Sequence, residues 1–145
     1  KEAKELEITS SRLHLPVDVL VSKSLDVATD IAIRPVGKVG ANEYVVDIGT
    51  DTVRLFQKVI ETARMIVWNG ALGLAEVPAF KNGSAAIAKM IANSQAEKII
   101  GGGDLINFLS QENLFDKMTY VSTGGGAMLE FLAGDKLPGI EVLEQ

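Results

Sequence analysis

Two glycine triplets, each between a short apolar run and a segment of helical periodicity, most constrain how this chain can fold. The first lies in IIGGGDLINFL, residues 99–109, and the second in YVSTGGGAMLEFL, residues 120–132. Glycine allows the backbone to turn tightly from a strand into a helix. Because each parallel strand needs a crossover to return the chain, the repeated plan predicts two consecutive strand–helix units of a parallel sheet.

The rest of the chain continues this alternation of short apolar runs and helix-period segments. Segment 30–43 has no clear period and is predicted to be a connection or a small exposed hairpin. The pattern predicts an α/β fold, a three-layer, doubly wound, Rossmann-like parallel sheet without an internal linker. The expected strands are 12–22, 44–49, 64–70, 97–100 and 119–122, and the expected helices are 51–63, with Val53, Phe56, Val59 and Ile60 on one face, 85–94, 104–111 and 125–133.

Composition excludes several classes of function. Lys and Arg total 14 against 19 Asp and Glu, and a formal charge of -5 is the wrong sign for a protein that holds nucleic acid by neutralising phosphates. The 145 residues include no cysteine and one histidine, His14, which excludes disulfides, thiolate metal sites and multi-histidine sites. We therefore expect no nucleic-acid partner.

The positive mean hydropathy of +0.21 does not come from a membrane-spanning segment, because the apolar runs are short. No run approaches the roughly 18 residues of a membrane span, and the charged opening KEAKELE does not resemble a signal peptide. We expect a soluble, cytoplasmic protein that does not bind membranes. Since the sequence starts at Lys1 instead of Met, we also expect it to be a piece of a larger molecule. In that molecule, further chain would cover the apolar surface of this piece.

The glycine triplets predict a phosphate site. At the carboxyl end of a parallel strand, backbone N–H groups and the positive end of the next helix dipole are available to an anion. Neither triplet fits a known regular pattern, because no Gly-Lys-Ser/Thr occurs and Ile106 or Leu129 stands where the dinucleotide fingerprint needs a third glycine. The alternative is that the glycines only permit tight turns and close helix packing.

Asp104, directly after the first triplet, extends this hypothesis to a bound cation. A carboxylate repels a phosphate unless a cation lies between them, and Mg²⁺ is commonly held by one or two carboxylates together with substrate phosphates. The alternative is that Asp104 caps the following helix, and on spacing alone capping is the more common role.

Five further segments carry a resemblance to a known family. The segments LPVDVLVS, DIG, VWNGALGLAE, IIGGGD and STGGGAMLEFLAGDKLPG, in this order and spacing, make the chain closely similar to phosphoglycerate kinase over practically all 145 residues. The resemblance places residues 1–145 in the last third of that enzyme, within its C-terminal nucleotide-binding domain. It implies a glycolytic kinase that transfers a phosphoryl group between 1,3-bisphosphoglycerate and ADP, giving 3-phosphoglycerate and ATP, with Mg²⁺ as cofactor.

The resemblance also implies roles for individual residues. Asp104 approaches the metal, Glu76 binds the ribose hydroxyls, Asn69 lies near the phosphates and Leu15 belongs to the adenine pocket. The residues implied to bind the nucleotide are Leu15, Asn69, Glu76, Gly101, Gly102, Gly103, Asp104 and Leu105. The catalytic set, facing the transferring phosphoryl group, is Gly124, Gly125 and Gly126.

Departures from the family pattern leave alternatives open. The family usually has proline at Ala71, a bulky aromatic residue at Ala75, and Ser or Thr at Leu105, so nucleotide affinity is in doubt and a non-catalytic nucleotide-binding module of the same ancestry is the alternative. A dinucleotide-dependent oxidoreductase is a weaker alternative, since the dinucleotide fingerprint is missing.

Two parts of the family's enzyme have no counterpart in this sequence. They are the phosphoglycerate-binding domain with its catalytic arginine, and the first part of the nucleotide domain with its lysine. We expect this chain to be inactive alone and the full-length enzyme to be monomeric.

Three other polar residues have a functional and a structural interpretation. Asp18 and Asp47 follow apolar runs and could reach the ligand cleft, although holding local turns is the more frequent use. His14, between two leucines, is predicted to be an ordinary strand histidine, not a catalytic base.

Overall fold

Two small sheets, instead of the single expected one, organise the chain. The computed structural model describes residues 12–143. One sheet has the order β2-β1-β3 and is antiparallel, and the other has the order β4-β5-β6 and is parallel. The strands are β1 (Asp18–Ser22), β2 (Ala32–Pro35), β3 (Tyr44–Ile48), β4 (Met65–Asn69), β5 (Glu97–Gly101) and β6 (Tyr120–Ser122).

The helices follow the expected order, with ends that shift by a few residues. Short 3-10 helices lie at Val36–Lys38, Pro78–Phe80 and Phe115–Lys117. None of the helices within residues 12–143 has the length and apolar character needed to cross a membrane. The α-helices are α1 (Thr50–Ile60), α2 (Asn82–Asn93), α3 (Gly103–Gln111), α4 (Gly125–Ala133) and α5 (Pro138–Glu141).

The α/β class and the parallel sheet are confirmed, but the two N-terminal strands do not join that sheet. β1 pairs antiparallel with β3 and with β2, which lies in the segment that had no clear period. The expected strand 12–22 also shortens to β1, so His14 is exposed and lies outside a strand. The pairing of such short strands depends on the neighbouring strands more than on local sequence. Hydrophobic periodicity therefore did not reveal the antiparallel pairing of β1 with β2 and β3.

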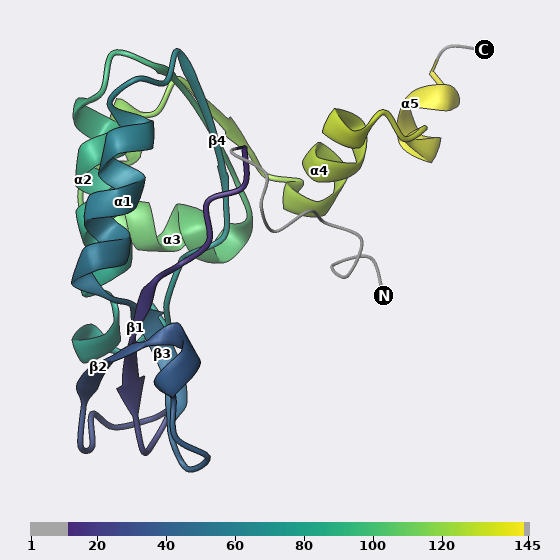
Figure 1. Cartoon of the computed structure of the whole chain (residues 1–145). Coiled ribbons are helices and arrows are strands. Elements are labelled where there is room, and N and C mark those ends of the chain that lie inside the picture. The colour runs from purple at the N-terminus through teal and green to yellow at the C-terminus, as the bar shows by residue number, and fades with distance from the viewer. Residues whose placement is uncertain (1–11, 144–145) are drawn as a thin grey trace.

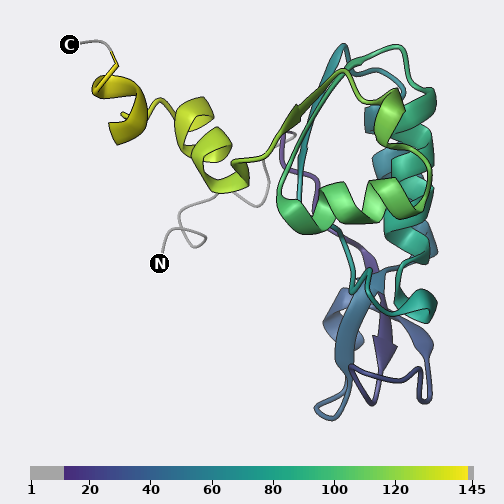
Figure 2. The ribbon, with the colours of Figure 1, turned by 180° about the vertical axis from the view of Figure 1, so that it is seen from behind.

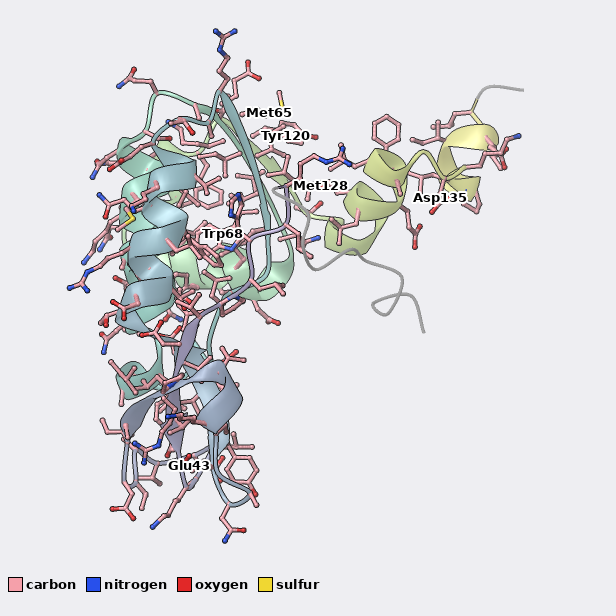
Figure 3. All side chains as sticks on the ribbon, viewed as in Figure 1. Glu43, Met65, Trp68, Tyr120, Met128 and Asp135 are labelled. Carbon is pink, nitrogen blue, oxygen red and sulfur yellow. The ribbon has the colours of Figure 1, made fainter. Side chains whose placement is uncertain are left out.

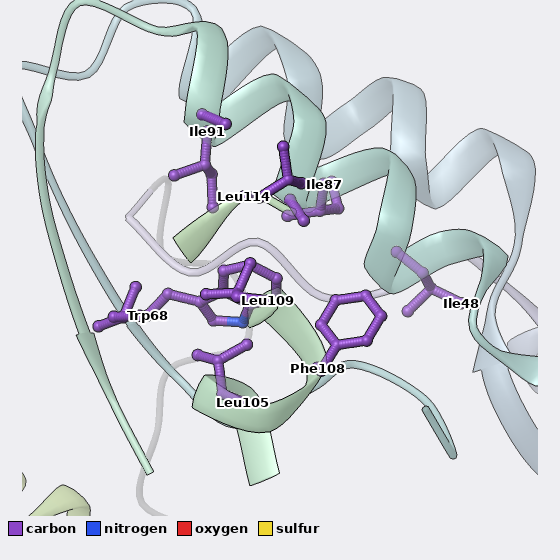
Figure 4. Close-up of a cluster of buried hydrophobic side chains, with 11 residues drawn as sticks. Ile48, Trp68, Ile87, Ile91, Leu105, Phe108, Leu109 and Leu114 are labelled. Atoms are coloured by element: carbon purple, nitrogen blue, oxygen red, sulfur yellow. The ribbon is translucent and has the colours of Figure 1, made fainter. Parts of the chain in front are cut away.

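One face of the parallel sheet carries the core. α1, α2 and α3 lie on the same side of β4, β5 and β6 (Figures 1 and 2). Right-handed crossovers between strands that are consecutive in the sheet place α2 and α3 on one face. α1, which leads into β4 from the other sheet, packs against α2. In this core, Trp68 of β4 and Ile100 of β5 meet side chains of α2, of α3 and of the segment after α3. The helix-side residues are Ile87, Ile91, Leu105, Phe108, Leu109 and Leu114 (Figure 4).

The opposite face of the parallel sheet is uncovered within residues 12–143. Met65 is 55% exposed and Tyr120 is 62% exposed (Figure 3). No residue of α4 is buried, and α4 and α5 extend away from the sheet in both views (Figures 1 and 2). The described residues thus form two layers of the doubly wound fold, a sheet with helices on one face.

The first turn of α1 is held by a carboxylate from another element. Asp18 of β1 accepts hydrogen bonds from the N–H groups of Asp51, at 3.1 Å, and Thr52, at 2.7 Å, and from the Thr52 hydroxyl, at 2.7 Å. Gly49 precedes the helix, and any side chain there would collide with the Asp18 carboxylate. Asp18 therefore supplies the cap that the local sequence of α1 lacks.

Asp47 of β3 performs the same task for α2. Its carboxylate accepts hydrogen bonds from the N–H of Gly83, at 2.6 Å, and from its neighbour Ile48, at 2.9 Å. Both Asp18 and Asp47 are buried. The prediction that these two aspartates hold local turns is wrong, because their main partners are helix N–H groups more than thirty residues away.

The two carboxylates differ in protonation equilibrium. Burial acts to raise the pKa of Asp18, but the hydrogen bonds from Thr52 and Asp51 outweigh burial and leave that pKa below its ordinary value. Burial dominates at Asp47 and raises its pKa despite the bond from Gly83. Asp18 therefore favours the folded state when ionised, whereas ionised Asp47 opposes it.

Replacing Asp18 by asparagine in the full-length protein should lower the free energy of unfolding by about 1 kcal/mol at neutral pH, because the amide keeps one acceptor oxygen but loses the second acceptor and the charge. Because the folded pKa is depressed, this contribution is present above the unfolded value and is lost as pH falls through the folded pKa. The difference from wild type, measured by urea unfolding, should accordingly shrink in acid. Asp26→Asn, at an exposed aspartate, is the control, and a difference that does not change with pH would contradict the capping role.

Candidate functional site

The three parallel strands end together, and each is followed by a glycine-containing loop. In the strand register Asn69 of β4 pairs with Gly101 of β5, which pairs with Ser122 of β6. The carboxyl ends of parallel strands are where open α/β sheets bind ligands. The structure thus brings both glycine triplets and the Trp-Asn-Gly segment to one edge of the sheet.

The first triplet leads from β5 into α3. Gly101 ends the strand, Gly102 has a φ of 97° and Gly103 is the first helical residue. The conformation of Gly102 is one that residues with a Cβ rarely adopt. No side chain caps α3, so the N–H groups of its first turn have no side-chain acceptor.

Asp104 lies in the first turn of α3 but does not cap it. Gly102 occupies the N-cap position, and no hydrogen bond joins the Asp104 carboxylate to the helix. The side chain is exposed, at a helix end whose dipole favours a negative group. The capping alternative for Asp104 is therefore wrong, and its carboxylate is available to a ligand or cation.

The second triplet starts α4 and touches the first. Gly124 is the N-cap residue and Gly125 and Gly126 begin the helix, again without a side-chain cap. A Cβ atom placed on Gly125 would lie 2.7 Å from the backbone N of Gly102 and 2.8 Å from its Cα. Only glycine allows this contact between the backbones of the two loops. Gly126 has open space at the corresponding position.

Asn69 joins the two glycine loops. Its Nδ2 donates a hydrogen bond of 2.8 Å to the carbonyl oxygen of Gly125. Its Oδ1 lies 2.9 Å from the position that a Cβ on Gly102 would occupy. The Asn69 side chain and the two glycine loops, each from the end of a different strand, are therefore in contact.

Glu76 and Asp104, predicted to bind a nucleotide, meet across one hollow. This pocket has a volume of about 140 Å³, and α3 supplies one of its walls. Asn107 and Gln111 were not predicted, although their spacing of three and seven residues from Asp104 on a helix would have placed them on the same face. The lining residues are Ala75, Glu76, Asp104, Asn107, Phe108 and Gln111.

The loop that carries Glu76 is held by the helix that follows it. The hydroxyl of Ser84, which is fully buried, accepts hydrogen bonds from the N–H groups of Leu72, at 2.9 Å, and Gly73, at 3.2 Å. The N–H of Leu74 donates to the carbonyl of Val46 at 2.9 Å. These bonds fix residues 72–74, two positions before Glu76.

Leu105 and Leu15, both predicted to bind the nucleotide, contribute no side chain to this hollow. Leu105 is 0% exposed and belongs to the core between α3 and the sheet. Its side chain cannot line a ligand site, so only its backbone could contribute. Leu15 is 46% exposed in the segment before β1 and does not line the hollow.

The chemistry available at this edge suits an anion more than a free metal ion. Residues 12–143 contain no cluster of three or more His, Cys, Asp or Glu side chains able to hold a metal. A single carboxylate such as Asp104 is suited to a cation that is also coordinated by the phosphates of a ligand. Two helix N-termini without side-chain caps offer N–H groups to such phosphates.

Comparisons with known proteins point to one family. The family model described as phosphoglycerate kinase matches residues 1–135. The curated phosphoglycerate kinase of Syntrophobacter fumaroxidans is 42% identical over 134 residues, which are 92% of this chain and 34% of the relative. That of Coxiella burnetii is 44% identical over 133 residues, again 92% of this chain and 34% of the relative.

Solved structures give the same result. Phosphoglycerate kinase from Coxiella burnetii matches with a TM-score of 0.82 and 44% identity, over 90% of this chain and 34% of that structure. The enzyme from Pyrococcus horikoshii matches with a TM-score of 0.75 and 32% identity, over 89% and 32%. The chain spans about a third of the length of these relatives.

Replacing Gly125 by alanine should destabilise the protein by about 1–3 kcal/mol, since the new methyl group meets the backbone of Gly102 and the loops must separate. Urea unfolding of the full-length protein measures this change. Gly126→Ala is the matched control at the next helical residue, where space is open, and we expect it to be neutral or stabilising by up to about 1 kcal/mol. Equal effects of the two substitutions would show that the loops are not in contact.

Proposed function

The chain belongs to the phosphoglycerate kinase family, and we propose that it supplies the ADP- and ATP-binding elements of a phosphoglycerate kinase. In the full-length protein the reaction is phosphoryl transfer between 1,3-bisphosphoglycerate and ADP, giving 3-phosphoglycerate and ATP in glycolysis. The observation that carries the proposal is the contact of two glycine loops with uncapped helix N-termini at one sheet edge.

We assign roles to the residues at this edge. Backbone N–H groups of Gly101–Gly103, with that of Leu105, hold the phosphates of the nucleotide. The backbone N–H groups of Gly124–Gly126 face the phosphoryl group in transfer, and Asn69 keeps the two loops together beside the phosphates. Glu76 accepts hydrogen bonds from the ribose hydroxyls, and Leu15 contacts the adenine. Phosphoryl transfer depends on such positioning and on neutralisation of charge.

Asp104 is the residue that would hold Mg²⁺ together with the nucleotide phosphates. Two like unit charges 4 Å apart repel by about 4 kcal/mol near a protein surface, so an unscreened Asp104 would weaken phosphate binding. Mg²⁺ held there would neutralise charge on the phosphate oxygens, and the N–H groups of α3, which no side chain caps, would orient these oxygens.

We also propose that residues 1–145 are part of the C-terminal nucleotide-binding domain of a longer, monomeric, cytoplasmic enzyme. In that enzyme, a phosphoglycerate-binding domain and the first part of the nucleotide domain correspond to the remaining length of the relatives. The apolar, uncovered face of the parallel sheet, with Met65, Val67 and Tyr120 exposed, supports a covering layer from this remaining part. The charge of -5 supports the absence of a nucleic-acid partner.

A non-catalytic nucleotide-binding module is the second candidate, because of Leu105 and Ala75. Leu105 is buried and cannot offer a hydroxyl to a phosphate or metal, and Ala75 leaves the hollow beside Glu76 partly unfilled. Calorimetry with MgADP and a coupled assay with 3-phosphoglycerate, MgATP, a dehydrogenase and NADH separate the two functions. Binding with turnover supports the kinase, binding without turnover supports the module, and absence of both contradicts the family function.

Replacing Asp104 by asparagine in the full-length protein should raise the Mg²⁺ concentration for half-maximal rate about tenfold, equivalent to about 1.4 kcal/mol of lost cation binding. The coupled assay at increasing Mg²⁺ measures this value. Asp116→Asn, at an exposed aspartate outside the hollow, should leave it unchanged. An unchanged Mg²⁺ dependence in Asp104→Asn would remove the cation role of Asp104.

A further inference from the structure

One ion pair joins the two elements that line the hollow with Glu76 and Asp104, at residues just outside the lining itself. Lys81 Nζ lies 2.6 Å from Glu112 Oε1, and the side chains are 31% and 16% exposed. Lys81 ends the loop that carries Glu76, and Glu112 directly follows α3, next to Gln111, which lines the hollow. Within residues 12–143 this is the ion pair that connects the loop to α3.

The position of Lys81 is unfavourable for its own helix. Lys81 is the N-cap residue of α2, where the helix dipole disfavours a cation and where Ser, Thr, Asp or Asn usually stands. Its ammonium group reaches instead to Glu112 at the C-terminal end of α3, where the dipole of α3 favours a positive charge. The side chain is therefore placed to connect two elements, not to support α2.

Within residues 12–143, no hydrogen bond or ion pair joins residues 75–80 directly to α3. The loop is fixed at Leu72–Leu74 by Ser84 and Val46, and at the other end Phe80 is fully buried. Between these points Ala75 lines the hollow with a single methyl group, opposite Phe108 and Gln111 of α3. The bond from Lys81 to Glu112 is thus the polar link between the end of this loop and the end of α3.

We propose that Lys81 and Glu112 are positioning residues that set the width of this hollow, and so place the Glu76 carboxylate against the hydroxyl groups of a bound ribose. This inference rests on the proposed nucleotide-binding function. It assigns the pair no contact with the ligand. Loss of the pair lets the loop that carries Glu76 move away from α3, and the hydroxyl contact weakens while the phosphate contacts at the glycine loops remain.

The test compares ADP with 2′,3′-dideoxy-ADP, which lacks the hydroxyl groups that Glu76 would bind. In the full-length protein, Lys81→Met should weaken MgADP binding about three- to fivefold, the value of a pair worth up to about 1 kcal/mol. Binding of the dideoxy analogue should not change. Isothermal titration calorimetry gives both dissociation constants, and the preference for ADP over the analogue should shrink.

Matched variants separate positioning from stability. Lys23→Met breaks an exposed ion pair of 2.8 Å with Asp30 in the antiparallel sheet and should leave the preference for ADP unchanged. The charge-reversed double variant Lys81→Glu with Glu112→Lys should regain part of the lost preference. Thermal unfolding of each variant shows whether it is folded.

Each outcome decides between the inferences. If Lys81→Met lowers the melting temperature but keeps the full preference for ADP, the pair only stabilises the fold and the positioning role is overturned. If both nucleotides weaken equally, the pair does not act through Glu76. If the wild-type protein binds neither nucleotide, the proposed function itself fails. A selective loss for ADP with rescue by the double variant supports the positioning role.

Discussion

The first N–H groups of every helix need acceptors, and this requirement divides the described helices into two kinds. α1 and α2 receive theirs from Asp18 and Asp47, two buried carboxylates on neighbouring strands of the antiparallel sheet. α3 and α4 begin at glycines and receive no side-chain cap. The small antiparallel sheet thus closes two helix ends from within, and the parallel sheet leaves two open at its carboxyl edge. An open helix end that is held rigidly, and not merely frayed, is able to bind an anion.

The sequence predicted the parallel units well because their signals are local. Apolar runs, glycine punctuation and helical period place β4, β5, β6 and the helices between them within a few residues. The antiparallel sheet was missed because β2 has no period of its own and pairs with β1 through a turn. The caps of α1 and α2 come from residues more than thirty positions away, as with Asp18 and Thr52, and no local pattern reveals such partners. Val59, expected on the core face, is exposed near the end of α1.

The candidate site divides in the same way. Glycine placement and the Trp-Asn-Gly segment led to Asn69, Gly125 and the hollow with Glu76 and Asp104, but not to the contact between Gly125 and Gly102. That contact depends on how two strands register in space. Leu105 shows where the prediction fails, because Asp104 directly before it lines the hollow while the Leu105 side chain is buried in the core. The assignment of ligand roles to these residues stays a prediction.

The uncovered face of the parallel sheet connects the fold to the function. The buried residues lie on the side of α1, α2 and α3, whereas the other side exposes Met65, Val67 and Tyr120. Apolar side chains on a parallel sheet are normally covered on both faces. Gly101 lies on that open side, where a Cβ would meet Met128 of α4 at 2.6 Å, so α4 begins at the border between covered and uncovered surface. A layer that packs on this face would therefore touch the helix that starts at the second glycine triplet, and would couple the position of that triplet to the rest of the protein.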